Sequence, residues 1–185
     1  MSETLKEALR LRELGFAVHW LQPRTKIPLL SGWATAPVPS LEELERTYRE
    51  GFNVGFRAGK YSIVDGREVC VLDVDIKDPT YAEEAYACAN VILKGGFLPE
   101  VTTGSGDGRH QYIRFPLGGS PKKAATTLRH SDVWVLGGKP CASSMKGARP
   151  AWVIELLSTG KNVVAPPSIH PATGKPYIWR KDESA

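Results

Sequence analysis

The sequence predicts an α+β fold built around a mainly antiparallel β-sheet. Many short segments have the alternating pattern of β-strands, and three segments have the caps and apolar spacing of helices. These strands and helices do not alternate regularly, as they would in a parallel β-α-β fold. With 185 residues, the chain is long enough for one domain with a proper core.

The composition is that of a soluble globular protein. Hydrophobic residues make up 42% of the chain and charged residues 24%. The net charge of +4 and the isoelectric point near 9.0 permit a polyanionic partner without requiring one. No apolar run could cross a bilayer and no signal segment is present, so we expect no membrane partner and a cytoplasmic location.

The cysteines indicate neither a disulfide framework nor a zinc site. Cys70, Cys88 and Cys141 are odd in number and have no C-x-x-C spacing. A reducing compartment suits such a chain best.

The first part of the chain predicts two helices and two strands. Ser2 caps the first helix, and Ser40 with Glu43 forms a capping box for the second. In order, we expect a helix from Ser2 to about Leu14 that Gly15 ends, a strand at Phe16–Leu21, a helix from Ser40 to near Gly51, a strand at Asn53–Phe56 and a turn from Gly59 to Gly66.

The rest of the chain predicts one helix among several strands, with a poorly patterned insertion at about 117–150. The expected elements are a strand at Cys70–Ile76, a helix from Asp78 or Thr80 to about Asn90, and strands at Glu100–Thr103, His110–Phe115, Val133–Leu136, Trp152–Leu157, Asn162–Ala165 and Tyr177–Trp179.

The strand Cys70–Ile76 carries two acids on one face. Because side chains alternate along a strand, Asp73 and Asp75 point the same way, with Cα atoms about 6.5–7 Å apart. Carboxylates at this spacing can bracket one divalent cation, or two that share a ligand. The alternative is a strand end whose acids meet water or cap the next segment.

The segment from Thr103 to His110 places three glycines between two strands. Glycines let backbone N–H groups, such as that of Gly106, converge on an anion, and Ser105 and His110 can add side-chain donors. The chain has no P-loop motif. The alternative is a plain hairpin turn with His110 on the surface.

Four further residues are candidates for the same chemistry. Glu155 lies in an apolar strand, where an acid needs a partner, unless it is on the solvent face of an edge strand. Lys26 and Lys161 lie in turns and can contact phosphate, although such lysines are more often solvated. His170 follows a rigid Pro-Pro-Ser turn and is a ligand, a donor or a packed histidine.

Seven motifs, in order, give the chain a specific resemblance. They are Gly15-Phe16 with Thr25-Lys26-Ile27-Pro28, Gly32-Trp33, Asn53-Val54-Gly55, Leu72-Asp73-Val74-Asp75, Thr103 to His110, Ile154-Glu155 and Ala165-Pro166-Pro167-Ser168-Ile169-His170-Pro171. Together they resemble the bifunctional primase–polymerase (prim-pol) domain of the archaeo-eukaryotic primase superfamily, over nearly the whole chain.

The resemblance implies a fold and a set of site residues. It implies an RNA-recognition-motif-like sheet at about 67–185 that bears the acids, joined to an N-terminal α/β unit at about 1–66. The metal ligands would be Asp73, Asp75 and Glu155, and His110 would be catalytic as well as nucleotide-binding. The other nucleotide-binding candidates are Lys26, Ser105, Gly106, Lys161, Ser168 and His170.

The implied activity is template-directed nucleotidyl transfer by a DNA primase or polymerase that uses two Mg²⁺ or Mn²⁺ ions. The implied partners are a single-stranded DNA template, a primer, NTPs or dNTPs, and a helicase as a further domain or separate protein. Trp33 and Trp134 are candidates for stacking on bases. Some members carry a zinc-binding stem, but residues 117–150 contain only Cys141 and His130, so we expect no zinc.

Two other functions compete with this one. The chain could be a catalytically silent module that binds single-stranded nucleic acid. It could also be a metal-dependent nuclease or replication initiator, a class that commonly needs an H-x-H metal pair. Here Gln111 and Tyr112 follow His110, so the second histidine is missing.

Overall fold

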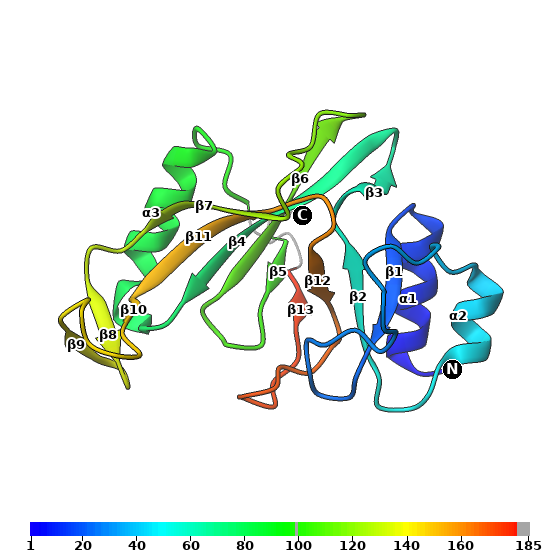
Figure 1. Cartoon of the computed structure of the whole chain (residues 1–185), viewed down its shortest axis with the longest axis horizontal. Coiled ribbons are helices and arrows are strands. Elements are labelled where there is room, and N and C mark those ends of the chain that lie inside the picture. The colour runs from blue at the N-terminus through cyan, green and yellow to red at the C-terminus, as the bar shows by residue number, and fades with distance from the viewer. Residues whose placement is uncertain (99, 181–185) are drawn as a thin grey trace.

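The computed structural model describes residues 1–98 and 100–180, which form one seven-stranded β-sheet, two three-stranded sheets and three α-helices (Figure 1). The elements are α1 Glu3–Glu13, β1 Ala17–Leu21, α2 Leu41–Thr47, β2 Asn53–Arg57, β3 Gly59–Val64, β4 Arg67–Ile76, the 3-10 turn η1 Pro79–Tyr81, α3 Ala82–Ile92, β5 Val101–Thr102, β6 Arg109–Pro116, β7 Ala125–His130, β8 Trp134–Leu136, β9 Lys139–Cys141, β10 Arg149–Pro150, β11 Trp152–Leu157, β12 Asn162–Ala165 and β13 Ile178–Trp179.

The N-terminal unit is a three-stranded antiparallel sheet, ordered β1-β2-β12, with α1 and α2 beside it (Figure 1). Both predicted helix caps are present: Ser2 accepts a hydrogen bond from Leu5 N, and Ser40 and Glu43 form the capping box. Because β12 comes from residues 162–165, the first 66 residues do not form this sheet alone.

The main sheet has seven strands, of which six are ordered β13-β5-β6-β4-β11-β7. The remaining strand, β3, pairs with the beginning of β4, and every pairing in the sheet is antiparallel. The predicted α+β class with a mainly antiparallel sheet is therefore confirmed. The finer likeness to an RNA-recognition motif stays a prediction.

The two faces of the main sheet are covered differently. On one face, Leu72, Val74 and Ile76 of β4 are buried against Ala85 and Ala89 of α3. This is the apolar set that the alternation of the acid strand predicted.

On the opposite face, the N-terminal unit covers the beginning of β4. Val69 and Val71 share a buried core with Phe16, Phe56 and Tyr112. The Phe16 and Phe56 rings meet edge to face, with centroids 4.9 Å apart. The end of β4, with Asp73 and Asp75, is left partly exposed beside this core.

The expected turn at 59–66 is wrong over most of its length, because Gly59–Val64 is strand β3. Ser62 explains why this segment is extended: its buried hydroxyl accepts from Ala17 N at 2.9 Å and donates to Arg57 O at 2.6 Å. These bonds tie β3 to the N-terminal sheet, and only Asp65 and Gly66 turn.

Other boundaries also differ from the expected ones. The second helix ends at Thr47 rather than near Gly51, and the third begins with η1 and runs to Ile92. The insertion at 117–150 contains β7, β8, β9 and β10 rather than one short strand, and β10, β8 and β9 form the small third sheet. Among the described residues, no helix is long and apolar enough to span a membrane.

Candidate active site

Strand register places three polar side chains in one row across the middle of the main sheet. His110 on β6 is opposite Asp73 on β4, and Asp73 is opposite Glu155 on β11. Directly opposed residues of antiparallel strands project from the same face, with Cβ atoms about 4.5–5.5 Å apart. Asp73 therefore lies between the imidazole of His110 and the carboxylate of Glu155.

The same face of β4 continues through Asp75 to Lys77, because every second residue points the same way. Lys77 Nζ lies 2.6 Å from Asp75 Oδ2, and both side chains are partly exposed. Lys77 was missed by the sequence prediction. The same alternation that places Asp73 and Asp75 on one face also places Lys77 there, two residues after Asp75, so Lys77 could have been predicted.

A hollow of about 250 Å³ lies over these acids. Six of the predicted residues line it: Lys26, Asp73, Asp75, Ser105, His110 and His170. They come from four separate parts of the chain, so the fold assembles them. The remaining lining residues are Val74, Ile76, Lys77, Thr103 and Tyr177.

Neighbouring groups shift the pKa of Asp73. Burial acts to raise the pKa of Asp73, but His110, with Lys26 and Lys77 further away, outweighs burial and lowers the pKa below its ordinary value. His110 Nε2 lies 3.5 Å from Asp73 Oδ1. Asp73 is therefore an ionised carboxylate at neutral pH.

The chemistry of Asp73 and Asp75 fits a divalent cation, because carboxylate oxygens on one face of a hollow are the hard donors that Mg²⁺ and Mn²⁺ prefer. Glu155 does not line this hollow, and its Oε1 accepts from Thr127 Oγ1 at 3.3 Å. Over residues 1–98 and 100–180, no three His, Cys, Asp or Glu side chains are grouped to hold a metal ion. A ligand set of three acids stays a prediction.

A comparison with protein families identifies the chain. The family model for the N-terminal domain of bifunctional DNA primase/polymerases, Prim-Pol, matches residues 8–185. The chain belongs to the Prim-Pol family. Membership implies, in general, the nucleotidyl transfer of a DNA primase or polymerase. A search of curated proteins gave no match.

In this Prim-Pol chain, the glycine turn packs against the segment that carries His170. A Cβ added at Gly104 would collide with His170 Cβ and lie 2.5 Å from Lys175 O. Thr173 Oγ1 also donates to Gly104 O. Only glycine allows this close approach, which brings Ser105 and His170 into one hollow.

Hydrogen bonds within the turn fix its shape. Ser105 Oγ lies 2.7 Å from Thr103 Oγ1 and accepts from Gly108 N at 3.3 Å. The guanidinium of Arg109 donates to the carbonyls of Gly106 and Gly108 at 2.8 and 2.9 Å. These hydrogen bonds fix the turn without any ligand. Phosphate binding by Ser105 and Gly106 stays a prediction.

His170 presents a neutral ring to the hollow. Burial lowers its pKa, with a contribution from Lys26, so the imidazole is uncharged at neutral pH. Thr173 N donates to His170 Nδ1 at 3.4 Å. Thr173 Oγ1 lies 3.3 Å from the same nitrogen, and in the tautomer in which Nδ1 accepts, Nε2 carries the proton and can donate it to an anion.

Tyr177 is a site residue that the sequence prediction missed. Its buried ring lies 6.0 Å, between centroids, from both His110 and His170. Burial raises the pKa of its phenol, and the charges of Asp73 and Asp75 raise it further, so the hydroxyl stays protonated. A single tyrosine before a short strand belongs to no recognisable motif, so Tyr177 could not be assigned to the site from the sequence.

Asn53 is a third residue that was missed, and it joins two segments of the site. Its Nδ2 donates to Thr25 O at 2.9 Å and to Ile169 O at 2.8 Å, and its Oδ1 accepts from Ile169 N at 2.9 Å. Thr25 precedes Lys26, and Ile169 precedes His170. The motif Asn53-Val54-Gly55 was noted in the sequence, but it gave no indication of this contact.

Ser168 and Lys161 do not line the hollow. Ser168 is 1% exposed, and its hydroxyl accepts from Val54 N at 2.8 Å and donates to Val54 O at 2.9 Å. Lys161 bonds Ala58 through its backbone carbonyl. Ser168 thus holds the scaffold in this structure, and nucleotide contacts by either residue stay predictions.

Proposed function

We propose that this protein is a template-directed nucleotidyltransferase, a DNA primase or polymerase, that works at the hollow over Asp73 and Asp75. The proposal is carried by one juxtaposition: two carboxylates share a hollow with Lys26, His170 and Ser105. A polymerase needs acids for cations beside donors for a triphosphate, and membership of the Prim-Pol family supports this interpretation.

In the proposed reaction, the 3′-oxygen of a primer forms a bond to the α-phosphorus of the incoming nucleotide, and pyrophosphate leaves. Asp73, Asp75 and Glu155 would hold Mg²⁺ or Mn²⁺, with Glu155 reaching them from its position opposite Asp73. When bound, such cations would lower the pKa of the attacking 3′-hydroxyl and neutralise the negative charge of the departing pyrophosphate.

The chain's own donors would orient the triphosphate. Lys26 and Lys77 supply positive charge, and His170 can donate from Nε2. Ser105 adds a hydroxyl, so the hollow contains donors as well as the two acids. His110 lowers the pKa of Asp73 through its contact with Oδ1, and we do not propose it as the general base. Positioning and electrostatics supply most of the catalysis in phosphoryl transfers of this kind.

One assay separates this proposal from its alternatives. The wild-type chain is incubated with a labelled primer–template, dNTPs or NTPs, and Mg²⁺ or Mn²⁺, with EDTA as the control for metal removal. We expect the primer to lengthen, and EDTA to abolish lengthening. Shortening would indicate the nuclease, and binding without any change in length would indicate the silent module.

A further inference from the structure

The insertion at residues 117–150 concentrates positive charge. It contains six lysine or arginine residues and one acid, Asp132, which gives a net charge of +5 against +4 for the whole chain. The rest of the chain therefore has a net charge of −1. The six basic residues are Lys122, Lys123, Arg129, Lys139, Lys146 and Arg149, and all of them are exposed.

Four of these basic residues flank strand β7 at its two ends. Lys122 and Lys123 come just before it, and Lys139 and Lys146 lie on the small sheet and loop that follow it. Figure 1 shows this small sheet beyond the end of β7, on the side away from the N-terminal unit. The six residues of β7 span about 20 Å, enough for more than one phosphate along a strand of nucleic acid.

Strand β7 is the edge of the main sheet and continues the acid face. Thr127 is opposite Glu155, and Glu155 is opposite Asp73, while His130 is opposite Val153, and Val153 is opposite Asp75. Thr127 and His130 therefore project from the same face as the two acids. A nucleic-acid strand lying along β7 would be separated from the acid strand β4 by β11 alone.

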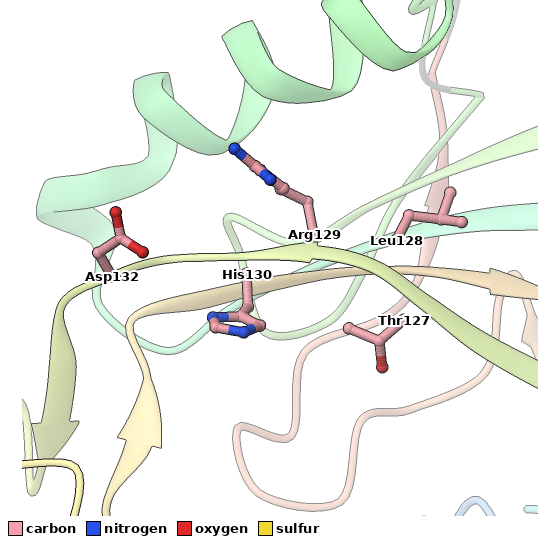
Figure 2. A pocket seen from close by; sticks show the side chains of 5 residues that line it. All are labelled: Thr127, Leu128, Arg129, His130 and Asp132. Atoms are coloured by element: carbon pink, nitrogen blue, oxygen red, sulfur yellow. The ribbon is translucent and has the colours of Figure 1, made fainter.

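A hollow of about 400 Å³ lies along this edge, lined by Thr127, Leu128, Arg129, His130 and Asp132. Figure 2 shows Thr127 and His130 on one side of β7, and Arg129 on the opposite side, toward α3. The partly exposed Trp134 ring lies 6.3 Å, between centroids, from the His130 ring. These aromatic rings offer a surface on which bases can stack.

We propose that the β7 edge, with Lys122 and Lys123 at one end and Lys139 and Lys146 at the other, is the track that binds the single-stranded template. Exposed basic residues meet the phosphates, and Trp134 and His130 meet the bases. The inference rests on the proposed function only in taking the bound strand to be a template. The binding of single-stranded DNA can be measured without catalysis.

The test compares three double charge reversals. K122E/K123E and K139E/K146E change the two ends of the track, and K6E/R46E makes the same charge change on α1 and α2, at the other end of the molecule. Fluorescence anisotropy with labelled single-stranded DNA, longer than a site of about 16 nucleotides, gives the Kd at several salt concentrations in EDTA. Circular dichroism checks that each variant is folded.

Each track variant should bind the single strand at least about tenfold more weakly at low salt, and its salt slope should fall by about 1.4, which is the share of two phosphate contacts. The control variant should keep at least most of the wild-type affinity. Equal loss in the control, unchanged binding in both track variants, or a loss confined to duplex DNA would overturn the proposal.

The outcome is separable from the test of the proposed function. If the wild-type chain extends primers but both track variants bind DNA normally, only the proposed template track is contradicted. If the wild-type chain extends no primer but the track variants lose single-strand binding, only the proposed polymerase activity is contradicted.

Discussion

The contact between His110 and Asp73 sets the charge of the candidate site. Burial raises the pKa of Asp73, but His110 together with Lys26 and Lys77 lowers it below its ordinary value, which favours the ionised carboxylate that a cation needs. Asp75 forms a more exposed ion pair with Lys77, and such a pair contributes little to stability. The pKa of Asp73 is thus set by groups packed around it, whereas Asp75 has only a partly exposed lysine as its ion-pair partner.

His19 is the residue whose titration should affect stability most clearly. Burial lowers its pKa from 6.5 to about 4, and Nε2 is held 2.9 Å from Asn162 Oδ1. Because the folded pKa lies below the unfolded one, the neutral ring contributes stability above about pH 6.5. That contribution is lost as the pH falls toward 4.

We therefore expect wild-type stability to fall by about 2 kcal/mol more than that of His19→Gln between pH 7 and pH 5, from about 1.4 kcal/mol per pH unit. Urea denaturation at the two pH values measures this difference. His130→Gln, a change of an exposed histidine, is the control. Parallel pH profiles for wild type and His19→Gln would contradict the assignment.

Among single residues, alternation alone could predict that Asp73 and Asp75 share a face, because the period of a strand is local. It could not predict that Glu155 would be opposite Asp73, since register depends on how two distant strands pair. Nor could it predict Tyr177, whose place between two histidines exists only after folding.

Among the elements, Asn53 at the beginning of β2 joins the loop of Lys26 to the segment of His170. Its side chain is 2% exposed, so its three hydrogen bonds have little competition from water. If these segments hold the triphosphate, Asn53 is a positioning residue that never touches it.

Asn53→Ala should lower the free energy of unfolding by about 2–3 kcal/mol, from three lost hydrogen bonds. It should also weaken nucleotide binding by about tenfold, because Lys26 and His170 would lose their fixed separation. Urea denaturation and nucleotide titration measure the two effects.

Asn53→Asp keeps the acceptor for Ile169 N but puts a carboxylate oxygen against the carbonyls of Thr25 and Ile169, so its loss of stability should be at least as large as that of Asn53→Ala. Asn90→Ala, a change of an exposed residue on α3, is the matched control and should leave both measurements unchanged. A folded Asn53→Ala variant with wild-type nucleotide affinity would contradict the positioning role.

At the scale of elements, local signals predicted the helix beginnings well, since a cap is made by neighbouring residues. They failed at 59–66, where the extended shape depends on Ser62 reaching β1 and β2. They also could not place β12 in the first sheet, because that pairing joins residues more than 100 positions apart.

In the whole molecule, the site lies where two buried cores end. One core fills the space between the main sheet and the N-terminal unit, and the other fills the space beneath α3. The N-terminal unit covers only part of the sheet's acid face. The uncovered part carries the acids, with the loop of Lys26 on one side and β7 on the other.

The measurement that tests this account most directly is primer extension by Asp73→Asn, Asp75→Asn and Glu155→Gln, each confirmed as folded. Asp65→Asn, a change of an exposed acid in the turn between β3 and β4, is the control. We expect each site variant to lose at least about a hundredfold in rate, the effect of several kcal/mol of lost charge stabilisation, and the control to lose none. Near-normal extension by any two of the three site variants would contradict the proposed site.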